Sequence, residues 1–135
     1  MAAWRAARNP PPILTAADLD ARRPVWEALS DLFLDTDITL SRDWRVRVLA
    51  ASPYTLAELD AILRSEIYPV CIHNLFSIAG EWAGFDVQTL EHAILKQKTA
   101  RFGWPHALTI HLGMALIRAD WHTDKQAIIT ARSTR

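Results

Sequence analysis

The 135-residue chain has the length of one domain, and half of its residues are hydrophobic, which excludes an intrinsically disordered protein. Its 15 Lys and Arg residues balance its 15 Asp and Glu residues, so net charge predicts no general attraction to nucleic acid or to an anionic membrane. The single cysteine excludes an internal disulfide framework, and no hydrophobic run approaches the ~20 residues that span a bilayer.

The N-terminal residues 1–14 are predicted to be an extended arm that ends in three prolines, Pro10–Pro12, which cannot be helical. Thr15 and Asp18 have the spacing of helix-capping residues and predict a short helical turn. The next helix is expected to begin at Pro24, because proline suits a first helical position and breaks a helix interior. Its hydrophobic residues recur with a helical period: Val25, Trp26, Leu29, Leu32 and Phe33.

A second helix is predicted from Ser41, as N-cap, to about Ser52, with Trp44, Val48 and Leu49 pointing inward. Thr55 and Glu58 match a capping box, the clearest helix start in the chain. The hydrophobic residues after this start recur at helical spacings: Leu56, Leu59, Leu63 and Ile67.

Pro69 is predicted to open a further helix by the same first-position argument. Within "HNLFSIAGEWAGFD", residues 73–86, Gly84 can end this helix and Asp86 can cap the next one. The stretch is therefore interpreted as a tight corner between two helices rather than as a ligand-binding loop. Trp82 and Phe85 are expected to pack at the corner, and Gly80, inside the helix, suggests that another backbone passes close by. The hydrophobic stripes of the two helices are Cys71, Leu75, Ile78 and Trp82 on the first and Leu90 and Ile94 on the second.

The last predicted helix starts near Pro105 and runs to about Ala119, either in the core or at an oligomer interface, because hydrophobic residues surround it. A strand at 107–112 is the alternative, since hydrophobic residues also alternate there. The expected fold is all-α, a single compact domain of five or six helices over residues 15–122. Residues 123–135 are expected to form a tail.

A stripe of polar residues lies in the second half of the segment "EIYPVCIHNLFSIAGE", residues 66–81. Asn74, Ser77 and Glu81 share one helix face, His73 borders it, and Glu66 precedes the helix. A histidine near two carboxylates can act as a general acid–base pair. The same residues suit a buried hydrogen-bond network that locks two helices together, or a partner contact. We expect the lock.

Acidic residues recur every four positions at Glu27, Asp31 and Asp35, followed by Asp37. Residues 16–40 hold six acidic residues against two arginines, a net charge of −4. Like charges at this spacing destabilise a helix slightly. The pattern predicts an exposed acidic ridge that binds a basic partner; an ordinary solvated face is the alternative.

Other chemistry is not predicted. The five histidines have no spacing typical of a metal site, and with four glycines no phosphate-binding glycine loop can be written. The basic runs are expected to be solvated helix faces rather than a nucleic-acid interface: Arg42, Arg45, Arg47 and Lys96, Lys98, Arg101. We predict no catalytic residue, no metal and no cofactor, and Cys71 is interpreted as a small core residue rather than a nucleophile.

Two segments, "RRPVWEALSDLFLDT" and "YTLAELDAILRSEIYPVCIHNLFSIAGEWAGFD", resemble a family of short bacterial proteins classed as a domain of unknown function, over about residues 22–95. The resemblance implies a small, helical, cytoplasmic bacterial protein and brings no established catalytic residue. The residues that carry it are Trp26, Leu29, Phe33, Leu34, Asp35, Glu66, Pro69, Asn74, Leu75, Ala79, Gly80, Glu81, Trp82 and Phe85.

The first functional hypothesis is a protein-binding module, most concretely an immunity-type protein that neutralises a bacterial toxin by occluding it. Its features are small size, a focused acidic face and no assembled catalytic constellation. The rival hypotheses are a small enzyme that uses His73 with Glu66 and Glu81, and a homo-oligomeric scaffold. A cytoplasmic location is expected, because the N-terminus lacks the hydrophobic region of a secretion signal.

Overall fold

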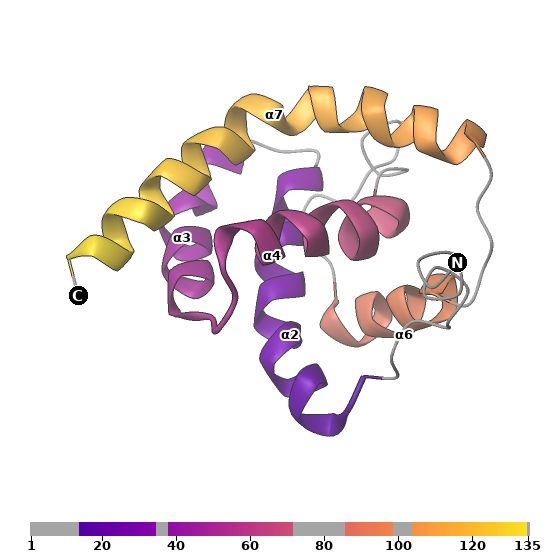
Figure 1. Cartoon of the computed structure of the whole chain (residues 1–135), viewed down its shortest axis with the longest axis horizontal. Helices are drawn as coiled ribbons and strands as arrows, with labels where there is room; N and C mark the ends of the chain where they lie inside the picture. Colours follow the sequence, from indigo (N-terminus) through magenta and orange to yellow (C-terminus); the bar gives the residue numbers. More distant parts are fainter. Residues whose placement is uncertain (1–13, 35–37, 72–85, 99–103, 135) are drawn as a thin grey trace, which may run out of the picture.

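The computed structural model describes residues 14–34, 38–71, 86–98 and 104–134, with the backbone alone for 97–98 and 104–113. All regular structure in these ranges is helical, which confirms the all-α prediction (Figure 1). The predicted N-terminal arm lies outside the described residues. None of the helices described is both long enough and hydrophobic enough to cross a membrane.

Helix α2 spans Ala16–Ser30 and is capped by Thr15 and Asp18, whose side chains and backbone N–H groups bond each other reciprocally. The predicted start at Pro24 is therefore wrong: the capping box begins the helix eight residues earlier, and Pro24 lies inside it. Proline has no N–H group, so the carbonyl of Asp20, four residues earlier, lacks its helical donor. Pro24 is exposed, and water can hydrate this carbonyl instead. The predicted hydrophobic residues of α2 are buried, and they continue into the 3₁₀ turn η1, Asp31–Phe33.

Helix α3 spans Arg42–Ala51 after the 3₁₀ turn η2, Ile38–Ser41. Ser41 precedes the helix as predicted, but its hydroxyl donates to the carbonyl of Ile38 instead of capping the helix. Leu49 is fully buried as expected, whereas Trp44 and Val48 are half-buried.

Helix α4 spans Leu56–Ile62 and begins with the predicted capping box of Thr55 and Glu58. It continues without a break into the π-turn η3, Leu63–Ile67, and helical backbone extends through residues 68–71. Pro69 thus does not open a new helix. A proline ring normally clashes with the carbonyl four residues earlier, here that of Ser65, and the wider π-turn makes room for it.

Helix α6 spans Val87–Lys98 and is capped by Asp86, whose carboxylate accepts from the backbone N–H of Thr89 at 3.0 Å. This cap, and the burial of Leu90 and Ile94, confirm the prediction for this helix. The other members of the predicted corner lie outside the described residues: Leu75, Ile78, Gly80, Trp82, Gly84 and Phe85.

Helix α7 spans Trp104–Ser133 and lies along α3 (Figure 1). Its start agrees with the prediction, but the expected end near Ala119 and the alternative strand at 107–112 are both wrong. The stretch expected to be a tail is helical to Ser133, because Asp124 and Ile128 are buried there. Arg132 fixes this end by donating to main-chain carbonyls of Leu49, Ala50, Ser52 and Tyr54 at and beyond the end of α3.

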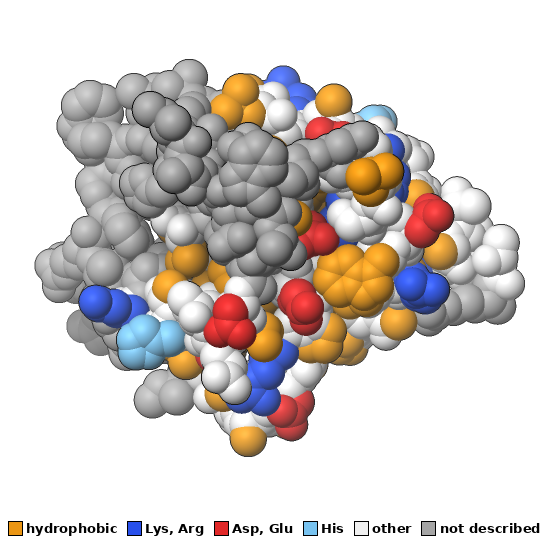
Figure 2. Space-filling view, turned by 180° about the vertical axis from the view of Figure 1, so that it is seen from behind, with side chains coloured by type: hydrophobic (Ala, Val, Ile, Leu, Met, Phe, Trp, Pro, Cys, Tyr) orange, Lys and Arg blue, Asp and Glu red, His pale blue; other side chains and the backbone are white. Residues whose placement is uncertain are grey.

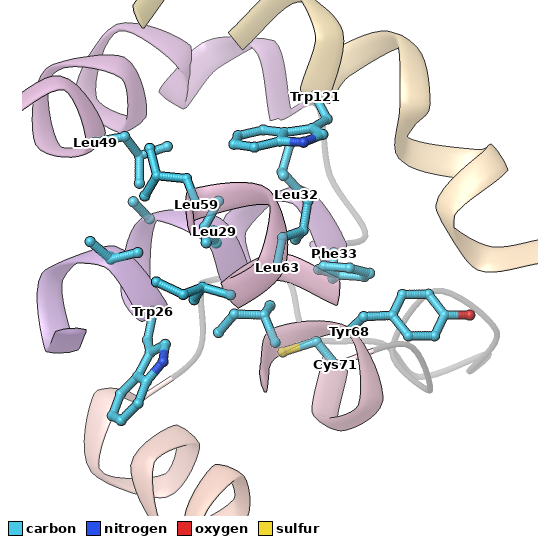
Figure 3. Packing of buried hydrophobic residues seen from close by; sticks show 14 of the residues in the cluster. Trp26, Leu29, Leu32, Phe33, Leu49, Leu59, Leu63, Tyr68, Cys71 and Trp121 are labelled. Atoms are coloured by element: carbon cyan, nitrogen blue, oxygen red, sulfur yellow. The ribbon is translucent and has the colours of Figure 1, made fainter. Parts of the chain in front are cut away.

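The hydrophobic core lies around α2, with contributions from every other helix. In Figure 3, Leu29 and Leu32 of α2 and η1 lie near Leu59 of α4 and Leu63 of η3, and Trp121 of α7 lies above them. The ring of Trp26 points toward α6 (Figure 3). The arrangement leaves one side of α2 and one side of α7 open to solvent, and these two sides hold the surfaces considered below.

Candidate functional site

The predicted polar site is described at one residue, Glu66, since His73, Asn74, Ser77 and Glu81 lie outside the described residues. Glu66 is 4% exposed, and its Oε1 accepts from Trp26 Nε1 at 2.7 Å and Arg22 Nε at 3.2 Å. Arg22 also donates to the Tyr54 hydroxyl at 3.2 Å. The Glu66 carboxylate therefore joins α2 to η3 through paired, buried polar groups, and the lock predicted for the whole stripe stays a prediction.

A second polar cluster, which the sequence did not predict, joins α3 to α7. Arg45 and Asp124 are both fully buried and form a bidentate pair, Nε to Oδ2 at 2.8 Å and Nη2 to Oδ1 at 3.0 Å. Arg42 donates from Nε to Asp124 at 3.0 Å and from Nη2 to Asp120 at 2.8 Å. We call Arg42, Arg45, Asp120 and Asp124 the α3–α7 ion cluster.

The remaining donor of Arg45, Nη1, bonds the Ser41 hydroxyl at 2.8 Å and the carbonyl of Ile38. The expected solvated face is therefore wrong for Arg42 and Arg45, and holds for Arg47, which is exposed. One feature of the sequence could have indicated this cluster. Two arginines lie three residues apart on one helix and two aspartates lie four apart on another, so each pair shares one helix face. This cluster fastens α3 to α7, and its half-buried member Arg42 also borders an open hollow between these two helices.

Cys71 is buried in the core, and burial raises the pKa of its thiol to about 12. At neutral pH it is a protonated thiol, which is a weak nucleophile. Within the described ranges, no three side chains of His, Cys, Asp or Glu converge where they could hold a metal ion.

The acidic ridge is described at two of its four residues. Glu27 is exposed, whereas Asp31 is half-buried beside Ser41 and Arg45; Asp35 and Asp37 lie outside the described residues. Burial raises the pKa of Asp31, and this effect exceeds the opposing influence of the Ser41 hydrogen bond and the Arg45 charge. Asp31 thus belongs partly to the interior, and Glu27 is the ridge residue that the structure places on the surface.

The exposed side of α2 carries a further acidic residue that the ridge pattern omitted. The Asp20 side chain is 75% exposed, and the spacing of Asp20, Pro24 and Glu27 puts all three on one side of the helix. We call these three residues the α2 outer face. Beside it, a shallow hollow with a mainly hydrophobic lining lies between α2 and the end of α3: Asp20, Ala21, Pro24, Val25, Val48, Ala51, Ser52 and Pro53.

Helix α2 runs behind α4 in Figure 1, so the reverse view in Figure 2 faces its side of the molecule. Acidic side chains lie near the middle of the described surface in that view, with hydrophobic side chains between them (Figure 2). Lys or Arg side chains lie among them (Figure 2). A surface that combines hydrophobic groups with charged ones can bind a partner of complementary charge.

Comparison with known protein families assigns the chain to one of them. A family model described as "Domain of unknown function (DUF7079)" matches residues 20–129, so the chain belongs to this family. No curated protein and no solved structure matches the chain. The match extends well beyond the segments that carried the resemblance, into the second half of α7, which includes both aspartates of the α3–α7 ion cluster.

Proposed function

We propose that this protein is a protein-binding module, most concretely an immunity-type protein that neutralises a bacterial toxin in the cytoplasm by binding it directly. The observation that carries the proposal is the α2 outer face, where Asp20 and Glu27 stand exposed on either side of Pro24, next to a hydrophobic hollow. The partner expected from this chemistry is a protein with a basic surface.

The proposal rests on the different roles of hydrophobic and charged groups at protein interfaces. Hydrophobic groups at the centre contribute most of the affinity, while charges at the rim steer the approach of the partner and select it. The net charge of −4 over residues 16–40 supplies such a field in a chain whose total charge is zero. A toxin that acts on nucleic acid would offer the complementary basic surface.

A rigid support favours binding without rearrangement. Trp26, on the other side of α2, is bonded to buried Glu66, and Arg22 ties the same helix to Tyr54. A helix held in this way loses little conformational entropy when a partner binds its outer face.

The test uses the product of the gene that lies beside the one for this protein. We expect the two proteins to co-purify, and expression of this protein to restore growth to cells that make the neighbouring product. Glu27→Lys should weaken binding by about tenfold or more, because it replaces attraction with repulsion. The matched control is Asp43→Lys, which makes the same charge change at an exposed residue of α3.

Two results would contradict the proposal. One is the absence of any complex and of any growth rescue with the neighbouring gene product. The other is equal weakening by Glu27→Lys and Asp43→Lys, which would show that total charge matters and the α2 outer face does not. Concentration-dependent self-association, with no hetero-complex, would point instead to the homo-oligomeric scaffold.

A further inference from the structure

A second hollow, of about 190 Å³, lies between η3 and α7, and positive charge dominates its lining. Arg118, His122 and Lys125 are four and three residues apart, so they share one side of α7, and Arg64 faces them from η3. Met114 and Trp121 complete the described lining, which contains no carboxylate. We call this set the α7 cationic hollow.

Two of the cations are held in place, Arg64 by Asp60 next to the hollow and Lys125 by Trp121 of its lining. Trp121 is 2% exposed, and its Nε1 donates to Asp60 Oδ1 at 2.9 Å. The other oxygen of Asp60 accepts from Arg64 Nε at 2.8 Å, which fixes that guanidinium. Lys125 Nζ lies 5.7 Å from the centroid of the Trp121 ring, within the range of a cation–π contact. Because these two side chains are already held, a ligand that binds them loses little conformational entropy in ordering them.

Hydrogen-bond donors remain free at the rim. Arg64 uses only Nε for Asp60, and among the described residues nothing bonds the two terminal nitrogens of its guanidinium. The side chains of Arg118 and His122 are exposed, and neither is hydrogen-bonded to a residue in the described part of the chain. Guanidinium groups offer paired N–H donors that match the oxygens of a phosphate group.

We propose that the α7 cationic hollow binds a phosphate dianion, either free or as the terminal group of a small ester. The charges match this ligand: Arg64, Arg118 and Lys125 contribute three positive charges, and Asp60, which is bonded to Arg64 next to the hollow, offsets one of them. The site is independent of the α2 outer face, since it lies on other helices and attracts the opposite charge. Its failure would leave the proposed function untouched.

The experiment is a titration of the full ¹⁵N-labelled chain, followed by NMR through the indole N–H signal of Trp121. Inorganic phosphate and glycerol phosphate are the two ligands, each compared with chloride at equal ionic strength. We expect a saturable shift of the Trp121 signal with phosphate and none with chloride. Arg118→Gln and Lys125→Gln should each weaken binding by about tenfold or more. Circular dichroism checks that each variant is folded.

The matched control is Arg47→Gln, which removes an exposed arginine of α3 and should leave binding unchanged. A tighter complex with glycerol phosphate would identify an ester as the ligand, and a tighter complex with inorganic phosphate would identify the free ion. Equal shifts with chloride, or equal weakening by Arg47→Gln, would overturn the proposal. Tighter binding of a single-stranded oligonucleotide, with steep salt dependence, would also overturn it in favour of nucleic acid.

Discussion

The α3–α7 ion cluster and the α2 outer face are built from the same kinds of charged side chain in opposite environments. Arg45 and Asp124 have no exposed side-chain surface, and each bonds the other twice. Asp20 and Glu27 stand in solvent, where Asp20 has one neighbouring arginine, Arg23. The first pair is part of the fold, and the second lies on the surface that we propose for a partner.

The difference shows that burial, rather than residue type, decides what a charge does in this protein. Inside, the charges attract each other strongly, and removing one of them leaves the other without water or a partner. Outside, water screens each charge, so a change there alters encounters with other molecules more than stability. Substitutions in the two regions should therefore have separable effects.

The largest effect on stability is expected from Asp124→Ala. The substitution leaves Arg45 buried without its carboxylate and removes one bond from Arg42, so the free energy of unfolding should fall by about 3–5 kcal/mol. Urea denaturation measures this. The control is Asp120→Ala, at a side chain that is 34% exposed and binds Arg42, for which we expect a loss below about 1 kcal/mol. Equal losses would show that burial is not the deciding factor.

A smaller loss is expected from Glu66→Gln, which keeps the shape of the side chain and removes its charge. The bonds from Trp26 and Arg22 lose their charge assistance, so the free energy of unfolding should fall by about 1.5–3 kcal/mol. Glu91→Gln makes the same change at the more exposed pair with Arg23 and should cost less. Thermal melting compares the parent with the two variants. A Glu66→Gln curve identical to that of the parent would show that the Glu66 charge does not stabilise the contact between α2 and η3.

Asp31→Asn should have the smallest effect, and its sign should depend on pH. Burial raises the pKa of Asp31 in the folded state, so the charged carboxylate slightly destabilises the fold at neutral pH. The cost disappears as the pH falls through the raised pKa toward the ordinary value of 3.8. Denaturation at pH 7 should show Asp31→Asn at least as stable as the parent, and this advantage should be lost by about pH 3.5. An advantage that grows as pH falls would contradict the placement of Asp31.

Local signals predicted much of the fold. The capping patterns at Thr15, Thr55 and Asp86 mark true helix starts, because a cap depends on residues three positions apart. The two prolines gave wrong helix starts, because a proline considered alone predicts the first position of a helix. A capping box upstream of Pro24 and a π-turn before Pro69 place each proline inside a helix instead.

Long-range pairing could not be predicted in this way. Arg45 and Asp124 are 79 residues apart, and nothing next to either one distinguishes a buried charge from a solvated one. The length of α7 beyond Ala119 depends on the same contact, since Asp124 and Arg132 bind α3. The α7 cationic hollow was missed because Arg64 and Lys125 meet only in the folded chain.

The most direct test of the central claim is the association rate of the partner at the α2 outer face. Stopped-flow mixing compares the parent protein with Glu27→Lys and Asp43→Lys at about 0.02 M and about 0.5 M salt. We expect Glu27→Lys to slow association several-fold at low salt, the difference to shrink at high salt, and the free energy of unfolding to stay within about 0.5 kcal/mol of the parent. A rate unchanged by Glu27→Lys at low salt, or slowed equally by Asp43→Lys, would contradict the account.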